Sequence, residues 1–478
     1  MTTMRRMFST ASLLFFLSTP SLAQTTAETT APPSAPVAPA ETAPTVNGSE
    51  GAPPSEVAQT PSAAPEPSPS AGAQASPESA PEAEATSTNV TQAPESATAQ
   101  APQADEKSEQ ALVKAEFGKG ILIGTHDEKF TVNLRGRMQL LASVLDPNGS
   151  ANTVTQVQVR RLRLVLQGNA WGPDLTYYFQ LAFSNRDTEA DQRLAVRDAY
   201  FTYSRLRDLN LRIGQMKVPY GRQRITSSSA LGMVDRSVVV AELNLDRDVG
   251  IHAFSKDLFG LGERLGYSLA VFGGDGRNRL AKNAGYLFAG RLNFTPLGGF
   301  DDNVEADIKR ESKPRLAFGV SAAYNQQTNR PQSTIGEPYP DSSVYFNYAH
   351  VGADFMFKWR GFFATGEWML RHANERTQSG IDENGDPVDY FSRESWGAFG
   401  QLGQMLTDSL EITARYGHIQ PLSNTDPDLS LTQELGGGLS YYFHQHNLKV
   451  QGDYFYLSEN ADFSAGDHQG RVQAQLFF

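Results

Sequence analysis

Arginines recur at every second residue in two consecutive segments of this chain. Arg135 and Arg137 lie in the first segment, and Arg161 and Arg163 lie in the second. In an extended strand, alternate side chains share one face, so each pair would point to the same side. A guanidinium group stays charged and matches the geometry of phosphate and carboxylate oxygens. The spacing therefore favours a cationic wall that binds or guides oxyanions.

Two interpretations of each arginine remain open. A single arginine could equally pair with a nearby carboxylate and brace the wall, but few acidic residues lie near the first four. Arg160 breaks the alternation, and we expect it at a β-bulge. The same alternation, extended to later strands, turns further arginines inward. These are Arg212, Arg291, Arg415 and Arg471.

The elements that must position these residues are β-strands. From Phe130 onward, apolar and polar residues alternate with a period of two, in runs separated by turn residues. We expect about sixteen strands, over residues 131–144, 155–171, 174–184, 194–204, 210–216, 249–255, 265–272, 286–295, 315–324, 344–358, 362–371, 390–404, 410–419, 431–443, 448–457 and 470–478.

The final strand indicates where such a sheet resides. Residues 469–478 read QGRVQAQLFF and end on an aromatic residue. In water, an apolar strand edge of this kind invites aggregation, whereas in a membrane barrel the last strand closes on the first and its apolar face meets lipid. Leu134, Met138 and Leu140 would face lipid on the first strand. The predicted fold is all-β, a transmembrane antiparallel β-barrel preceded by a disordered Pro/Ala-rich tail.

The N-terminal quarter of the chain has a different composition. Residues 1–23 carry two arginines, an apolar run and a small-residue cleavage site, as a secretory signal peptide does. Residues 24–107 are rich in Pro, Ala, Ser and Glu and contain no aromatic residue, so we expect a disordered periplasmic linker. Residues 108–129 form a short lead-in to the barrel domain at 130–478, and Asp105–Phe117 could form a short helix.

Loop lengths alternate between short and long, as in barrels with short periplasmic turns and longer outer loops. Two connections stand out. Pro296–Pro314 falls on the short side yet is long and charged, and the sequence offers no reason for it. Lys217–Asp248 is the longest outer loop, and we expect it to fold inward and narrow the channel. Its charged residues are Lys217, Arg222, Arg224, Arg236, Asp235, Glu242, Asp246 and Asp248.

The composition is consistent with a barrel and gives no sign of an enzyme. The mean hydropathy is −0.41, which suits strands that are half exposed to water. Cysteine is absent, and no base lies beside a nucleophile, so we expect no catalytic residue, metal site or cofactor. Aromatic residues near strand ends are expected in interfacial girdles. They are Tyr177, Tyr178, Tyr441, Tyr442, Phe443, Trp359, Phe362 and Phe363.

Several motifs, in their order along the chain, resemble the phosphate-selective porins O and P of Gram-negative outer membranes. They are LRGR at 134–137, the Arg160-Arg161 pair with LQG at 166–168, VRDAY at 196–200, IGQMKVPYG at 213–221, SSS at 227–229 and RDVG at 247–250. The resemblance covers roughly Phe130–Phe478. It implies a sixteen-stranded trimeric porin whose arginine ladder guides anions to a constriction. Arg135, Arg160 and Arg161 match the ladder, Asp198 resembles an inward acid, and Lys217 is the candidate for a central lysine.

We therefore expect a passive outer-membrane channel for small anions, phosphate or a related oxyanion first, with its N-terminal tail in the periplasm. The expected partners are the anionic solute, outer-membrane lipid and lipopolysaccharide, and two further copies in a homotrimer; nucleic acid is not among them. One alternative is a general or sugar-type nonselective porin. Another is a structural barrel tethered to the cell wall through its tail. The residues expected to line the pore or bind anions are Arg135, Arg137, Arg160, Arg161, Arg163, Asp198, Arg212, Lys217, Arg222 and Arg224.

Overall fold

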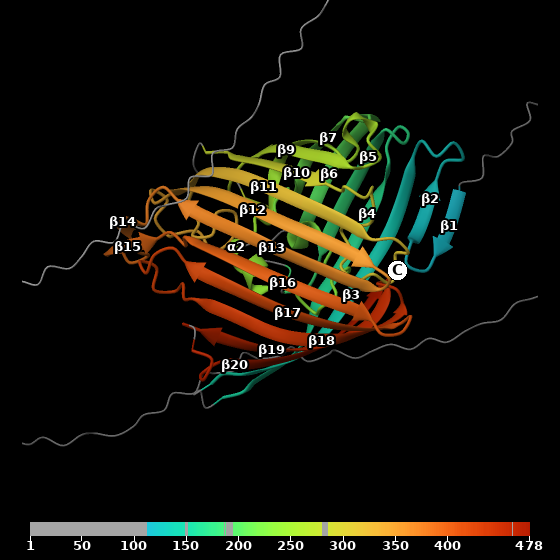
Figure 1. Ribbon diagram of the computed structural model, residues 1–478. Coiled ribbons are helices and arrows are strands. Elements are labelled where there is room, and N and C mark those ends of the chain that lie inside the picture. The colour runs from blue at the N-terminus through green and yellow to red at the C-terminus, as the bar shows by residue number, and fades with distance from the viewer. Residues whose placement is uncertain (1–111, 149–151, 186, 188–194, 280–284, 461) are drawn as a thin grey trace, which may run out of the picture. The chain divides into compact units, whose positions relative to one another are not determined.

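Sixteen antiparallel strands close into one barrel (Figure 1). The computed structural model describes residues 112–148, 152–185, 187, 195–279, 285–460 and 462–478. The strands of the barrel are β3 (Thr131–Asp146), β4 (Val154–Asn169), β5 (Leu175–Ala182), β6 (Val196–Leu206), β7 (Leu209–Lys217), β8 (Arg247–Ser255), β9 (Leu265–Phe272), β10 (Leu287–Phe294), β11 (Arg315–Thr328), β12 (Phe346–Trp359), β13 (Phe362–Ala373), β16 (Ser395–Met405), β17 (Leu410–Pro421), β18 (Thr432–His444), β19 (Leu448–Glu459) and β20 (Asp467–Phe477). The predicted fold class and the sixteen predicted strands are confirmed, with ends that differ by a few residues.

The last strand closes the barrel against the first, as its sequence indicated. β20 pairs with β3 from His468 opposite Asp146 to Phe477 opposite Arg137. Phe478 continues the ladder, because its N–H donates to the Gly136 carbonyl at 3.0 Å and its carbonyl accepts from the Gly136 N–H at 2.9 Å. Every strand of the barrel therefore has two neighbours, which removes the open edges that would promote aggregation.

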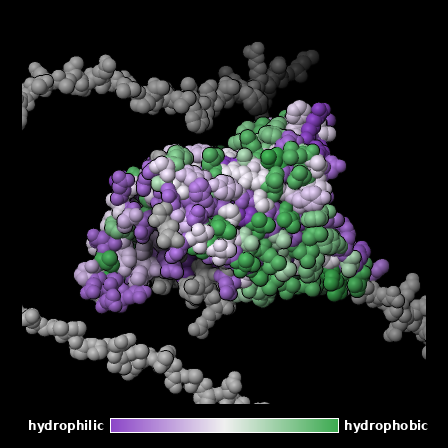
Figure 2. Space-filling model, turned by 90° about the horizontal axis from the view of Figure 1, so that it is seen from below, coloured by the Kyte–Doolittle hydropathy of each residue, from purple (hydrophilic) through white to green (hydrophobic). Residues whose placement is uncertain are grey.

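Side chains alternate between the two faces of the wall with the expected period. On β3, Met138 and Leu140 are exposed on the outside, whereas Arg137 and Gln139 are buried on the inside. Figure 2 shows hydrophobic residues gathered in a broad band on the outer surface. Hydrophilic residues dominate toward the left end, which in Figure 1 is the end with β14 and β15. Within the described residues, no helix is long and apolar enough to cross a membrane.

Shorter elements mark the two ends of the barrel. At the end that holds the C-terminus, called here the C-terminal rim, β1 (Leu112–Glu116) and β2 (Gly120–Gly124) form a hairpin, and β2 pairs with the start of β3. At the opposite end, called the long-loop rim, β14 (Thr377–Ile381) pairs with β15 (Pro387–Phe391). The short helices are α1 (Arg222–Ile225), α2 (Val238–Leu243) and the 3₁₀ turn η1 (Leu258–Gly260).

The segment that precedes β3 differs from its prediction. The helix expected over Asp105–Phe117 is wrong for its described part, because Leu112–Glu116 is a strand. Pairing with β2, which itself pairs with β3, overrides the helical propensity of this short segment. The signal peptide, the linker at 24–107 and the first residues of the lead-in lie outside the described residues.

Candidate pore lining

A β-bulge sets the direction of the arginines on the first two barrel strands. Gln139 of β3 faces Arg161 of β4, but the next residue, Leu140, faces Val159, so Arg160 is the extra residue. This confirms the expected bulge. Because the bulge absorbs one residue, Val157 and Val159 stay exposed on the outer face while Arg161 and Arg163 are buried on the inner one.

The bulge also lets two consecutive arginines bind one carboxylate. Asp235, in the connection between β7 and β8, lies 2.5 Å from an Nη atom of Arg160 and 3.3 Å from one of Arg161. Burial alone would raise the pKa of Asp235, but the charges of Arg161 and Arg160 outweigh it and lower that pKa below its usual range. Asp235 is therefore ionised at neutral pH, and it ties the β7–β8 connection to β4.

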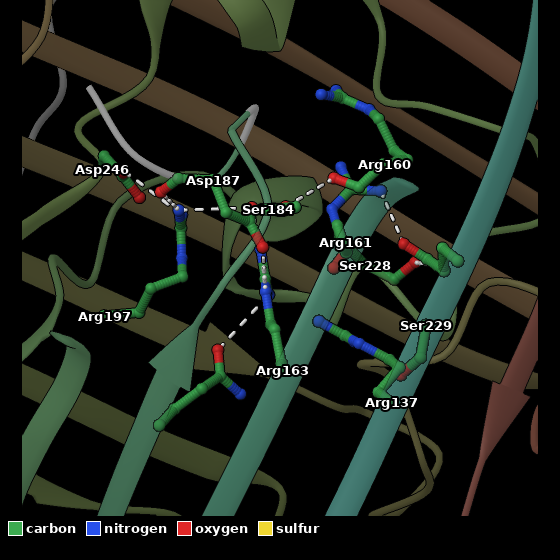
Figure 3. A network of polar contacts seen from close by, with 12 residues as sticks. Arg137, Arg160, Arg161, Arg163, Ser184, Asp187, Arg197, Ser228, Ser229 and Asp246 are labelled. Carbon is green, nitrogen blue, oxygen red and sulfur yellow. Dashed lines mark hydrogen bonds and ion pairs between the residues drawn. The ribbon is translucent and has the colours of Figure 1, made fainter. Parts of the chain in front are cut away.

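A second carboxylate serves two more arginines close by (Figure 3). Asp187, between β5 and β6, accepts two hydrogen bonds of 2.6 Å from Arg163, and it lies 3.4 Å from Arg197 of β6. Arg197 also lies 3.7 Å from Asp246. Of the predicted cluster, Arg160, Arg161 and Arg163 are thus paired with acids that lie far away in the sequence.

Arg137 differs from these neighbours. It is 5% exposed, and among the described residues its side chain donates one hydrogen bond, of 3.4 Å, to Ser227 Oγ. Its Nε and Nη2 atoms have no partner among these residues. Arg135 donates to the Gly118 carbonyl at 3.2 Å and lies 4.2 Å from the Phe477 ring centroid. These two arginines carry charge that no carboxylate of the described chain neutralises by direct contact.

The connection 218–246 lies against the inner wall of the barrel over much of its circumference. Tyr220 donates to a carbonyl of β12, the Asp235 carbonyl accepts from Arg415 of β17, and the Ser228 carbonyl accepts from Gln139 of β3. Between β17 and β3, the Leu231 carbonyl accepts from Lys449 of β19 at 2.8 Å. The connection starts at the end of β7, and β17 lies across the sixteen-stranded barrel from β7, so the connection crosses the lumen.

An apolar core fixes the middle of this connection. Ser237 accepts a hydrogen bond from the Val240 N–H and caps the start of α2. Val239, Val240 and Leu243 of α2 are fully buried, in one cluster with inward-facing residues of β13, β16 and β17. Those strand residues are Met369, Phe399 and Ile419. The inner face of these three strands is therefore apolar where α2 covers it, which an open water-filled wall would not be.

The long charged connection 296–314 has a structural role that the sequence did not reveal. It enters the lumen from the C-terminal rim, and one side chain, Glu305, joins it to the 218–246 connection. The Glu305 carboxylate accepts 2.8 Å hydrogen bonds from the Gly232 N–H, Gln223 and Gln401, and its N–H donates to the Ala230 carbonyl. Glu305 is 1% exposed. Two segments from opposite rims thus meet inside the barrel and fill it along β11–β20.

A cavity of about 780 Å³ remains along the other half of the wall, mostly along β3–β10. Among the described residues, twelve arginines and two lysines line it, against six carboxylates. The cationic residues are Arg137, Arg160, Arg161, Arg163, Arg197, Arg212, Lys217, Arg222, Arg224, Arg236, Arg247, Lys256, Arg277 and Arg291, and the acidic ones are Asp187, Asp198, Asp246, Glu263, Asp301 and Asp302.

Of the ten predicted pore residues, the structure brings nine to this cavity; Arg135 does not line it. Asp198 is buried and forms a two-point ion pair with Arg247, at 2.9 and 3.1 Å. Lys217 donates to the carbonyls of Ile225 and Thr226, at the C-terminal end of α1. Arg212 lies over the ring of Tyr200.

Arg222 and Arg224 of the 218–246 connection are both held in ion pairs. Arg222 is 2% exposed and sits between Asp302, at 2.5 Å, and Asp354 of β12, at 2.8 Å. Arg224 pairs with Asp246. The later inward arginines are likewise braces: Arg291 pairs with Asp354, Arg415 with Glu434 and Arg471 with Asp453. Bracing is thus the common state of the inward arginines.

Sequence reasoning missed several residues of the cavity. Arg197 and Arg247 flank Asp198 in space, and their place in the VRDAY and RDVG motifs was the signal that could have identified them. The predicted girdle is wrong for Tyr178, Tyr442 and Phe363. Tyr178 lines the cavity, and the other two are fully buried. Adjacent residues of a strand point to opposite faces, so only one of each neighbouring aromatic pair can reach lipid.

Comparisons with known proteins agree with this geometry and identify the family. The family model for phosphate-selective porin O and P matches residues 132–478. The chain belongs to the phosphate-selective porin O and P family. It is therefore an outer-membrane porin, and the resemblance found in its motifs is confirmed. No curated protein matches the sequence of this porin.

Solved structures of other porins share the fold at low sequence identity. The anion-selective porin from Comamonas acidovorans is similar with a TM-score of 0.50 and 11% identity, over 73% of this chain and 99% of that chain. The Salmonella typhi OmpF complex with daunomycin gives 0.49 and 14%, over 74% and 99%. The outer membrane channel DcaP of Acinetobacter baumannii gives 0.47 and 13%, over 73% and 97%. The first of these supports the barrel fold.

Proposed function

We propose that this porin is a passive channel for small anions, phosphate or a related oxyanion first. The observation that carries the proposal is the charge of the cavity lining, with fourteen cationic side chains against six carboxylates. A narrow aqueous passage with walls of one sign concentrates counter-ions and repels ions of like charge. Membership of a family described as phosphate-selective supports the choice of oxyanion.

In this proposal, the connection 218–246 is the constriction element. It crosses the lumen, so solutes are confined to the cavity along β3–β10. Arg137 is the residue we expect an anion to meet with least competition, because two of its guanidinium nitrogens lack a partner. The paired arginines contribute mainly to the positive potential of the cavity and less to direct binding of the anion. The carboxylates of Asp235 and Asp187 already occupy part of the guanidinium edges of Arg160, Arg161 and Arg163.

The surroundings of the channel follow from the same proposal. The porin sits in the outer membrane with the long-loop rim outward and the C-terminal rim toward the periplasm, which puts the tail at 24–107 in the periplasm. Lipid and lipopolysaccharide contact the apolar band, and the porin assembles as a homotrimer. Contact of the tail with the cell wall belongs to the tether hypothesis, and deleting 24–107 without loss of conductance would separate it from the channel function.

The first test is the ion selectivity of the purified protein in a planar bilayer. Under a KCl gradient, the reversal potential should show preference for chloride over potassium, and added phosphate should reduce the chloride current by occupying the cationic lining. A preference for potassium, or no preference and no block by phosphate, would contradict the proposal and leave a general porin.

A single substitution then tests the unpaired arginine. Arg137→Gln should lower the chloride-to-potassium permeability ratio by about fivefold, since one charge at close range in water is worth roughly 1 kcal/mol. The matched control is Arg360→Gln, which removes the same charge from an exposed turn at the C-terminal rim outside the cavity. An equal change in both variants would remove Arg137 from the proposed role.

A further inference from the structure

Five side chains form a continuous stack on the inner wall from β5 to β8, separate from the ion-paired cluster. Tyr178 and Tyr200 face each other across β5 and β6, with ring centroids 5.2 Å apart and planes at 14°. Arg212 of β7 lies 4.3 Å above the Tyr200 ring and 4.9 Å from the Phe254 ring. His252 stacks on Phe254 at 4.7 Å and 25°. We call these five residues the aromatic ladder.

The ladder belongs to the wall of the open cavity. All five of its residues line that cavity, and Gln180 connects it to the arginine cluster, because Gln180 donates to the Tyr178 hydroxyl and accepts from Arg163. On β7, Gly214 stands opposite Tyr200. A Cβ there would lie 2.2 Å from the Ala199 carbonyl oxygen, so no side chain from that position covers the Tyr200 ring.

Polar groups of the ladder are left available. The Arg212 Nε donates to Thr202 Oγ1 at 3.0 Å, and its two terminal nitrogens form no hydrogen bond or ion pair with the described residues. His252 is 7% exposed, and neither of its ring nitrogens has a hydrogen-bond partner in the described chain. An unpartnered buried imidazole beside a cation and a row of ring faces points to a ligand that is planar, anionic and a hydrogen-bond acceptor.

We propose that the aromatic ladder binds aromatic anions, namely aryl carboxylates or aryl phosphates, on their way through the channel. The ring of the solute stacks on a tyrosine or phenylalanine face, and its acid group meets Arg212 and His252. Stacked rings attract each other beyond simple burial, and a guanidinium can lie over a ring while its edge binds an acid group. A bare oxyanion uses only the charge and gains nothing from the rings.

This inference deepens the proposed anion channel and depends on it. The test uses the full-length porin in planar bilayers with two probes of equal charge and similar size, benzoate and cyclohexanecarboxylate. Benzoate, which is planar, should halve the chloride current at a concentration about threefold to tenfold lower than cyclohexanecarboxylate, the range that aromatic stacking supplies. Equal block by the two acids in an anion-selective channel overturns the ladder proposal and leaves the proposed function standing.

Variants localise the effect. Tyr200→Leu and, separately, Phe254→Leu should bring the benzoate-to-cyclohexanecarboxylate ratio toward one, while the reversal potential keeps its sign because no charge is removed. The matched control is Tyr203→Leu, which removes a tyrosine exposed on the outer face of the same strand and should keep the wild-type ratio.

Other results would contradict the proposal. An unchanged ratio in both ladder variants overturns it, as does block by a neutral sugar without block by benzoate. A potassium-selective wild-type channel overturns the proposed function itself, and the ladder proposal with it. Heat-dependent migration on a gel confirms that each variant is a folded barrel before its current is recorded.

Discussion

The two halves of the barrel interior handle charge in opposite ways. Along β11–β20, inward cations are matched closely by acids and covered by two segments from opposite rims; Arg415 and Glu434, for example, are 1% and 2% exposed in their side chains. Along β3–β10, cations outnumber acids around an open cavity. The same residue type therefore braces one half and charges the other. Whether an inward arginine has a carboxylate partner decides whether it stabilises the wall or adds positive charge to the cavity.

The largest effect is expected from a variant in the ion-paired half of the barrel, along β11–β20. Glu434 accepts hydrogen bonds from Arg415 and from the Val238 N–H, so Glu434→Ala would leave a buried cation without a counter-charge. We expect it to lower the free energy of unfolding by about 3–5 kcal/mol, the usual cost of breaking a buried ion pair, as measured by urea titration in lipid vesicles.

A control for this variant lies on the neighbouring strand. Glu459 ends β19 and is exposed, so Glu459→Ala should change the stability little. A similar small effect for Glu434→Ala would mean that the covered half is not held by its ion pairs.

The open half should respond in selectivity. Asp187→Asn removes one negative charge that Arg163 and Arg197 share, so we expect the chloride-to-potassium permeability ratio to rise about fivefold, from roughly 1 kcal/mol of Coulomb energy. Reversal potentials measure it. Glu459→Gln, which removes the same charge from an exposed residue outside the cavity, is the contrast and should leave the ratio unchanged; a fall in the ratio for Asp187→Asn would contradict the assignment of the two halves.

A smaller effect is expected from pH. Burial alone would raise the pKa of Asp187, but the hydrogen bond and charge of Arg163 and the charge of Arg197 hold that pKa below its usual range. A depressed pKa means that the ion pair is complete above about pH 4, the ordinary pKa of an aspartate, and is lost only below it. The difference in selectivity between wild type and Asp187→Asn should therefore be the same at about pH 7 and about pH 5.

Reversal potentials at both values test this directly. A difference that closes as the pH falls would show that Asp187 titrates in the ordinary range and that its arginines hold it less tightly than the distances indicate.

Local rules allowed the barrel wall to be predicted. Strand alternation depends on neighbouring residues only, so it located sixteen strands and even the bulge at Arg160, where two arginines in succession break the period. Alternation also placed Arg137, Arg161 and Arg163 inside. The same alternation explains the error in the aromatic girdle: Tyr441 and Tyr442 were both assigned to the lipid face, although consecutive residues of a strand point to opposite faces.

The contents of the lumen could not be predicted in the same way. Asp235 meets Arg160 from 75 positions away, and Gln401 reaches Glu305 across 96 positions. No periodicity encodes such pairings, since they depend on how two irregular segments fold inside a closed wall. The β1–β2 hairpin was also missed, because its alternation is too short to compete with the helical propensity of Lys114, Ala115 and Glu116.

The contacts of Glu305 make the two lumen segments thermodynamically interdependent. One carboxylate accepts hydrogen bonds from Gly232, Gln223 and Gln401 together. Withdrawal of either segment would therefore leave buried polar groups of the other without hydrogen-bond partners, at a cost of roughly 1–3 kcal/mol for each group. The two segments therefore share a single order–disorder equilibrium. In a histogram of single-channel currents, the covered half of the lumen would then be either wholly present or wholly absent, giving two populations without intermediate levels.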